Sequence, residues 1–173
     1  MNAYINLTLT YLHHLGASST SQPLPGPFPP DNVNKSLSFI TGVVFDGTPL
    51  FKHFGDVKED VRPAYPIGSV VSATFVGANP RNNLRLEQTY AAIEKLDAEV
   101  GRWVRIRDDS DWTLIYNWKR TSEVLGTSEV KIVWETEDWV EPGQYRIAYY
   151  GDSKPIGKPI TAFEGTSGEF VLT

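Results

Sequence analysis

The three histidines are the first side chains to test for chemistry, because imidazole can act as a base or bind a metal. His13 and His14 are adjacent, and adjacent side chains on a helix diverge by about 100°, so this pair cannot chelate one metal well. His53 lies between Lys52 and Phe54, with no obvious acidic or nucleophilic partner in the sequence. These contexts favour an exposed helix end for the pair and a structural role for His53.

An acidic cluster formed by Asp108, Asp109 and Asp111 precedes Trp112. Carboxylate oxygens are the ligands that Ca²⁺ prefers, so the cluster is a candidate site for this ion. It lacks the spacing and the glycine of an EF-hand loop, however, and a solvated turn is the favoured interpretation.

Nucleophilic chemistry has no recognisable motif in the chain. There are no cysteines, which excludes thiol nucleophiles, disulfides and cysteine-based zinc sites. The serines lack a G-x-S-x-G context, and no glycine-rich phosphate loop is present. The sequence therefore predicts no catalytic residue and no metal ligand in this chain.

Surface aromatic side chains are the remaining candidates for ligand contact. Trp103, Trp139 and Tyr150 fall off the main inward pattern and are candidates for a carbohydrate-stacking platform, although packing in a core or between domains is favoured. Asn6 and Asn34 each begin an N-x-S/T tripeptide, the acceptor pattern for N-glycosylation, which matters only if the protein is secreted.

The composition excludes several classes of partner. The 173 residues carry a net charge of -5, which argues against non-specific binding of nucleic acid and weakly against docking on anionic membranes. No run of 18 apolar residues exists, which argues against a membrane span. The N-terminus has no basic region ahead of its apolar stretch and does not resemble a signal peptide.

Two different segments precede the part of the chain that could position these side chains. Residues 2–15 are predicted to form a short helix, because apolar residues recur at close to helical spacing and Gly16 follows as a stop. Residues 17–36 contain five prolines, a composition typical of a linker or an extended surface strap.

From Ser69 onward the apolar period changes to two, which indicates β-strands. Short strands separated by loops rich in Gly, Asn, Asp and Pro are typical of a sandwich or a barrel. Four strands are predicted to point one set of side chains inward: Val71, Ala73 and Phe75; Trp112, Leu114, Tyr116 and Trp118; Val130, Ile132 and Trp134; Tyr145, Ile147 and Tyr149. RWVRIRD and GEFVLT are predicted as two further strands.

Two local features refine this prediction. Pro142-Gly143-Gln144-Tyr145 fits a tyrosine corner, in which the phenol bonds back to the backbone of the corner, although a plain hairpin with a buried tyrosine is an equal alternative. Ile147 then occupies the position of the second cysteine of an antibody domain. An antiparallel sandwich of immunoglobulin type is therefore the predicted fold. Residues 87–99 fit a helix as well as a strand by periodicity alone.

The run FVGANPRN at residues 75–82 resembles a hallmark of the C-terminal domain of neutral, non-lysosomal ceramidases. The resemblance extends upstream through FGDV at 54–57 and YPIG at 65–68. Downstream it includes QTY..IEK, DSDW with a following Y.W, PG.YRI.Y.G and FEGTS..F. Together these matches cover residues 54–172, in order, and the resemblance favours a strand for 87–99.

The resemblance implies the organisation of the whole chain. Residues 1–16 resemble the helix that closes the ceramidase catalytic domain, residues 17–53 resemble the strap that follows, and residues 54–173 are expected to form the immunoglobulin-like domain. The family hydrolyses the amide of ceramide to sphingosine and a fatty acid, with a zinc ion and a serine in a large N-terminal domain. None of those motifs occurs here, so this chain alone is expected to be inactive and to carry no cofactor.

The expected role is therefore to pack on the catalytic domain, within one polypeptide, and to support its folding, stability and secretion. Membrane contact is expected only through the full-length enzyme, and a secretory location follows from the resemblance. The residues expected to matter at motifs or at the interface are Asn79, Pro80, Trp112, Tyr145, Glu164, Gly165 and Thr166. The alternative is a free-standing module that binds glycan or lipid surfaces through its aromatic side chains.

Overall fold

The computed structural model describes residues 45–84 and 88–173, and this part of the chain is almost entirely β. The predicted helix over 2–15 and most of the predicted strap lie outside the described residues. None of the helical segments in the described part is long and apolar enough to cross a membrane. The elements are β1 (Val57–Glu59), β2 (Ala64–Tyr65), β3 (Val70–Gly77), the 3₁₀ turn η1 (Pro80–Asn82), β4 (Ala91–Asp97), β5 (Arg102–Asp108), β6 (Leu114–Ser122), β7 (Thr127–Glu135), β8 (Gly143–Ser153), β9 (Thr161–Thr166) and β10 (Phe170–Leu172).

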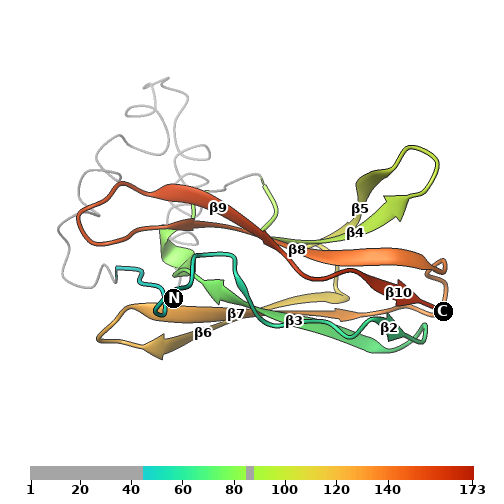
Figure 1. The fold of residues 1–173 in the computed structure, drawn as a ribbon, viewed down its shortest axis with the longest axis horizontal. Helices are drawn as coiled ribbons and strands as arrows, with labels where there is room; N and C mark the ends of the chain where they lie inside the picture. The colour runs from blue at the N-terminus through green and yellow to red at the C-terminus, as the bar shows by residue number, and fades with distance from the viewer. Residues whose placement is uncertain (1–44, 85–87) are drawn as a thin grey trace, which may run out of the picture. The chain divides into compact units, whose positions relative to one another are not determined.

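These strands form two sheets. The first has the order β1-β3-β7-β6, and the second has the order β2-β10-β8-β4-β5, with β9 also pairing with β8. All strand pairs are antiparallel except β2 with β10. Figure 1 shows the two sheets as two layers, with β3, β6 and β7 in one and β4, β8 and β9 in the other. The predicted mainly β, antiparallel class is confirmed.

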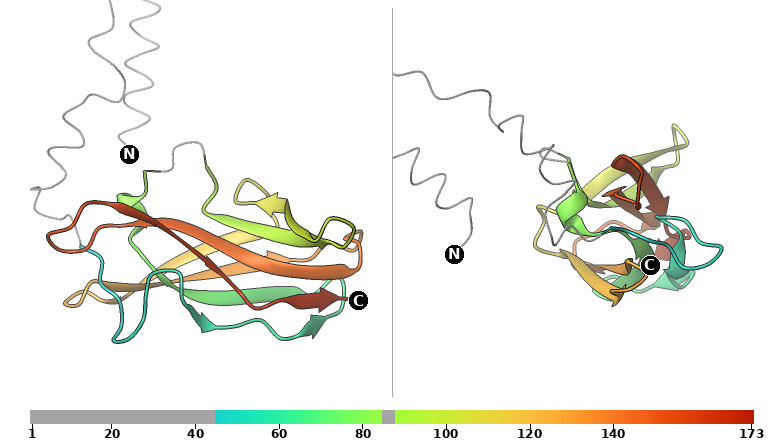
Figure 2. Two further views of the ribbon diagram at one scale, coloured as in Figure 1. Left: turned by 45° about the horizontal axis from the view of Figure 1, so that its top comes forward. Right: turned by 90° about the vertical axis from the view of Figure 1, so that its left-hand side faces the viewer.

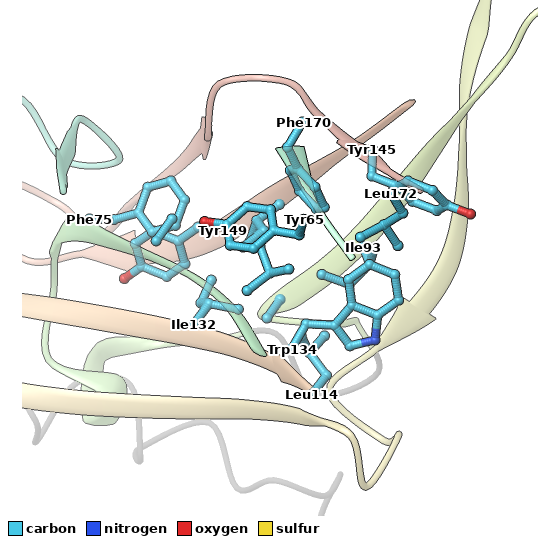
Figure 3. Packing of buried hydrophobic residues seen from close by; sticks show 14 of the residues in the cluster. Tyr65, Phe75, Ile93, Leu114, Ile132, Trp134, Tyr145, Tyr149, Phe170 and Leu172 are labelled. Atoms are coloured by element: carbon cyan, nitrogen blue, oxygen red, sulfur yellow. The ribbon is translucent and has the colours of Figure 1, made fainter. Parts of the chain in front are cut away.

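The core lies between the two layers and is rich in aromatic rings (Figure 3). Trp134 on β7 is fully buried, and its ring lies 5.6 Å from that of Tyr145 on β8 and 6.4 Å from that of Phe170 on β10. Farther along the sandwich, Phe75 on β3 lies 5.5 Å from Tyr149 on β8. These contacts join opposite sheets, so the alternating side chains predicted to point inward on β3, β7 and β8 do form the core.

The tyrosine corner is confirmed at Tyr145. The Tyr145 phenol donates a hydrogen bond to the backbone carbonyl of Glu141, four residues upstream. Burial raises the pKa of this phenol above its ordinary value, so the group stays protonated and remains a donor. The bond fixes the chain where it leaves the turn and enters β8.

Two tryptophans predicted to point inward are exposed, and the open choice over 87–99 is resolved. Trp118 on β6 is 36% exposed. Trp112, predicted to point inward, is 98% exposed, because it lies in the turn before β6 and the alternation begins only at Leu114. Of the helix and the strand that periodicity allowed over 87–99, the strand favoured by the resemblance is confirmed, since Ala91–Asp97 forms β4. This strand pairs with β5 on one side and β8 on the other, and Ile93 is fully buried, so two backbone ladders outweigh local helix propensity.

Replacing Tyr145 with Phe removes the bond to the Glu141 carbonyl and keeps the ring in the core. The expected result is a loss of about 1 kcal/mol in the free energy of unfolding, measured by urea denaturation. Because Tyr145 joins the core through its ring as well, Tyr145→Ala serves as the comparison and is expected to cost about 3–5 kcal/mol. Equal stability of Tyr145→Phe and the parent chain would contradict a structural role for the corner.

Candidate functional site

A buried carboxylate, that of Asp46, organises one end of the sandwich. Its side chain is fully buried and accepts a hydrogen bond from the Asn79 backbone N–H at 2.7 Å and another from Asn82 Nδ2 at 2.6 Å. The Lys154 backbone N–H donates a third at 2.9 Å, and the Arg120 guanidinium lies 3.9 Å away. Asp46 thus joins three segments that are far apart in the chain, the loop before η1, the end of β8 and strand β6.

The Asn79-Pro80 motif owes its conformation to this arrangement. Asn79 is extended, as a residue before proline must be, and its side chain accepts a hydrogen bond from the Arg81 backbone N–H to begin η1. A second acid supports the far side of the same loop, where the Leu84 N–H donates to Asp152 Oδ2 at 2.9 Å. Asn83 Oδ1 accepts from the Asp152 N–H at 2.6 Å. The motif is therefore a loop held by carboxylates on both sides.

The second motif, around Gly165, meets the chain near Gly55. A Cβ atom built on Gly165 would lie 2.0 Å from the Gly55 carbonyl oxygen, a distance that no side chain tolerates. Gly55 itself has φ of 89° and donates its N–H to the Val76 carbonyl at 2.9 Å. The FGDV, FVGANPRN and FEGTS runs of the sequence therefore converge, and FGDV contacts each of the other two through backbone atoms.

Aromatic rings connect this contact to the core. Phe163 of β9 lies 5.4 Å from Phe54 and 5.3 Å from Tyr149, ring centre to ring centre. The Tyr149 hydroxyl in turn accepts a 3.4 Å hydrogen bond from the Ala78 backbone N–H. The loop of the first motif and the strand of the second are thus supported by the same cluster of rings.

An open cleft of about 930 Å³ borders Glu164. Its lining is both polar and apolar and comes from the segment before β4, from β5 and the turn after it, and from β8 and β9: Gln88, Thr89, Tyr90, Arg105, Asp108, Asp109, Ser110, Tyr150, Ala162, Phe163 and Glu164. Burial, and then the neighbouring Glu94 carboxylate, raise the pKa of the Tyr150 phenol, which keeps it protonated. Hydrogen bonds from Ser110 lower the pKa of Asp108, which keeps that carboxyl charged.

The predicted acidic cluster lies partly in this cleft, but Asp108 and Asp111 bind within their own turn and Asp109 binds the segment before β4. Asp108 accepts from Ser110, Asp109 accepts from the Thr89 hydroxyl at 2.8 Å, and Asp111 accepts from the Asp108 N–H at 2.8 Å. Within residues 45–84 and 88–173, no three His, Asp or Glu side chains converge as metal ligands would. His53 is 89% exposed and lies 3.7 Å from Asp56.

The three aromatic residues considered as a sugar platform do not form one continuous surface of free rings. The Arg146 guanidinium lies 4.5 Å above the Trp103 ring, and Arg107 lies 4.6 Å above Trp139. The Tyr150 hydroxyl is 3.3 Å from Glu94 Oε1. Two of the rings are thus covered on one face by arginine, while Trp139 remains 71% exposed.

The remaining residues singled out from the sequence are dispersed. Glu164 and Thr166 are exposed on β9, and Trp112 projects from the turn before β6 at the opposite end of the first sheet from Asn79. Asn6, Asn34 and the histidine pair lie outside the described residues. Asp46, the centre of the site, lies in the run VVFDGT, whose sequence indicates only a turn at Asp46-Gly47. Nothing in the sequence shows that this aspartate will be buried under three distant segments.

Two packed, mainly antiparallel sheets with three converging motifs define a β-sandwich domain, and the comparisons with known proteins give its family. Residues 8–172 match the family model for the C-terminal part of neutral/alkaline non-lysosomal ceramidases. The chain belongs to this family.

Known relatives place the matched region within longer proteins. The chain is similar to the neutral ceramidase of Oryza sativa subsp. japonica (40% identity over 146 residues, 83% of this chain and 18% of the relative). It is also similar to neutral ceramidase 2 of Arabidopsis thaliana (40% identity over 149 residues, 85% and 20%). The crystal structure of the Pseudomonas aeruginosa neutral ceramidase superposes with a TM-score of 0.71 at 33% identity, over 78% of this chain and 21% of that one. The chain therefore spans about a fifth of the proteins it matches.

Replacing Asp46 with Ala leaves the backbone donors of Asn79 and Lys154 and the side-chain donor of Asn82 without their acceptor. We expect a loss of about 3 kcal/mol or more in the free energy of unfolding, because each buried donor left unsatisfied costs about 1–3 kcal/mol. Urea denaturation measures the loss, and Glu123→Ala, which removes an exposed carboxylate from the β6–β7 turn, is the control with no expected change. A loss below about 1 kcal/mol would show that Asp46 does not hold the loops together.

Replacing Gly165 with Ala forces the backbones of Gly55 and Gly165 apart. We expect a loss of more than about 2 kcal/mol, since the obstacle is a carbonyl oxygen and not a movable side chain. Gly157→Ala is the matched control, because Gly157 has φ of 70° and open space around it, so its cost is only the backbone strain of about 1 kcal/mol. Thermal unfolding of the two variants separates these effects, and equal losses would contradict the contact as a constraint.

Proposed function

We propose that this chain is the non-catalytic C-terminal region of a neutral ceramidase and that it supports the folding and stability of the catalytic domain. Family membership supports the assignment of the region, since the matched relatives are about five times as long. The observation that supports this role is that the polar residues of the motifs bind other groups of the same domain. Asn79 and Asn82 donate hydrogen bonds to Asp46, and Gly165 packs against the backbone of Gly55. These motifs therefore build a rigid surface.

The reaction of such an enzyme would be hydrolysis of the ceramide amide to sphingosine and a fatty acid, as the resemblance implies. The zinc ion of that reaction is assigned to the part of the enzyme outside this chain. The described residues do not fit such a site, because His53 projects into solvent and no set of potential ligands converges there. No step of the amide hydrolysis is therefore assigned to a residue of this chain.

The immunoglobulin type of the sandwich belongs to the same proposal. Two observations support it: the hydrogen bond of the Tyr145 corner, and a fully buried Ile147 two residues farther along β8, where apolar packing would replace a disulfide. A secretory location is also proposed, by resemblance and from the acceptor tripeptides at Asn6 and Asn34.

The alternative function, a free-standing module for glycan or lipid surfaces, draws its support from Trp112. This ring is 98% exposed, and aromatic rings stack on sugars and sit at membrane interfaces. Trp139 is also exposed, but Arg107 covers one of its faces. The alternative predicts that the chain alone binds its ligand, whereas the main proposal requires the catalytic domain.

Expression of the two halves of the enzyme separates these proposals. A catalytic part that ends before this region is expected to be poorly soluble or poorly stable alone, and to gain stability and ceramidase activity when this chain is co-expressed. The purified chain alone is expected to contain no stoichiometric zinc and to hydrolyse no ceramide. Full stability and activity of the catalytic part without this chain would overturn the supporting role, and activity of this chain alone would overturn the assignment as non-catalytic.

A further inference from the structure

Exposed apolar side chains gather on four loops at the Asp46 end of the sandwich. The loops are residues 47–52, 79–84, 122–126 and 154–160, and we call their combined surface the loop face. Seven large apolar side chains of the described residues are at least 70% exposed, and five of them lie here: Leu50 (81%), Phe51 (91%), Val124 (95%), Leu125 (70%) and Ile156 (78%). Leu84, 53% exposed, adds a sixth large apolar side chain. Figures 1 and 2 both show the β6–β7 and β8–β9 turns at the end where the described chain begins.

The loop face is held rigidly from below. Gly47 donates its N–H to the Gly126 carbonyl, and Asp46 donates its own to the Lys154 carbonyl, both at 2.9 Å. The Asp46 carboxylate adds the bonds to the Asn79 and Lys154 N–H groups. All four loops are therefore tied to one another beneath their apolar tips. A surface that is ordered before binding loses little conformational entropy when a partner docks.

Phe51 has the least expected conformation on this face. Its φ is 61°, and it is the one non-glycine residue with positive φ within residues 45–84 and 88–173. The turn is closed by the Lys52 N–H, which donates to the Pro49 carbonyl at 3.1 Å. Glycine would adopt this φ without strain, whereas a bulky residue pays about 1 kcal/mol. The Phe51 backbone is thus strained while its ring is exposed to solvent. Strained backbone positions cluster at functional and ligand-binding sites.

The net charge of the loop face is positive, whereas that of the whole chain is negative. The loop face carries Lys52, Arg81, Lys154 and Lys158 against a single acid, Glu123, whereas the chain has a net charge of -5. A partner that fits this face has an apolar centre and an acidic rim.

We infer that the loop face is the surface on which this region docks against the rest of the ceramidase polypeptide. This inference rests on the proposed function. Two observations select this occupant. About four-fifths of each matched relative lies outside the matched region, and the family model describes the C-terminal part, so the additional chain precedes the region. Asp46 and Gly47, which donate to the Lys154 and Gly126 carbonyls, lead directly into the first loop of this face, so the preceding chain enters the sandwich at this end.

Cysteine footprinting tests the docking surface, because the chain contains no cysteine and a single introduced thiol reports one position. Phe51→Cys and Ile156→Cys probe the loop face. Trp112→Cys and Val100→Cys are the matched controls, since both side chains are exposed and lie away from the loop face. Substitutions at such exposed positions leave the domain folded.

Each variant is alkylated as the isolated chain and as a fusion that follows the N-terminal part of the rice neutral ceramidase, and peptide mass spectrometry gives the rate at each position. We expect alkylation at positions 51 and 156 to slow by about tenfold or more in the fusion, with no change at 100 and 112. If the fusion is insoluble, the rice part is added in trans and association is followed by sedimentation velocity. Absence of association in both formats would overturn the inference.

The other occupants of such a surface give different results. Protection at 51 and 156 in the isolated chain that grows with its concentration would indicate self-association. Protection that requires vesicles of phosphatidylcholine and phosphatidylserine would indicate a membrane. Either result without protection in the fusion overturns the inference, as does protection at 112 or 100 alone. The proposed function fails separately, by equal stability of the catalytic part with and without this region.

Discussion

The hydrogen bonds to the buried Asp46 carboxylate are the interactions that hold together one end of the sandwich. Transfer of a charged carboxylate into the protein interior is unfavourable unless hydrogen bonds replace its water. Here two backbone N–H groups and one side-chain amide provide those bonds, and Arg120 lies 3.9 Å away. Because the donors come from the 79–82 loop and from Lys154, and Arg120 approaches from β6, one carboxylate fixes the relative positions of three segments.

This constraint explains why the motif at Asn79-Pro80 is a structural device. Its amide and backbone groups are used within the protein, by Asp46 on one side and by Arg81 on the other. The contact between Gly55 and Gly165 acts by a different principle, since the absence of a side chain lets two backbones meet. Polar satisfaction and close backbone approach therefore fix adjacent parts of the same end, and neither leaves a group free for chemistry.

Periodicity predicted those parts of the fold in which one face of a strand is buried. The inward sets on β3, β7 and β8 follow directly from alternation, because a side chain must point either to the core or away from it. Trp112 could not be placed in this way, since alternation does not show at which residue a strand begins. Residues 87–99 could not be assigned either, because the ladders of β4 with β5 and β8 are long-range and leave no local mark.

The site was less predictable than the fold for a related reason. The Asn79-Pro80 and Glu164-Gly165 runs could be singled out, but Asp46 acquires its role only when Lys154 and Asn82, at distant positions in the chain, fold around it. A turn aspartate in solvent and a buried aspartate that joins three segments have the same local sequence. The difference is a property of tertiary structure.

The Asp46 end of the sandwich combines buried hydrogen bonds with exposed apolar side chains. The Asp46 carboxylate and the Asn79 and Lys154 N–H groups bind one another inside the protein, whereas Leu50, Phe51 and Ile156 are exposed to solvent. A domain whose stability required these apolar side chains would bury them, and the aromatic core around Trp134 provides that stability without them. Their exposure is therefore not needed for the fold of this region, and contiguous exposed apolar surface favours association in water. The region is built to fold around its own core and to leave one prepared surface for a neighbour.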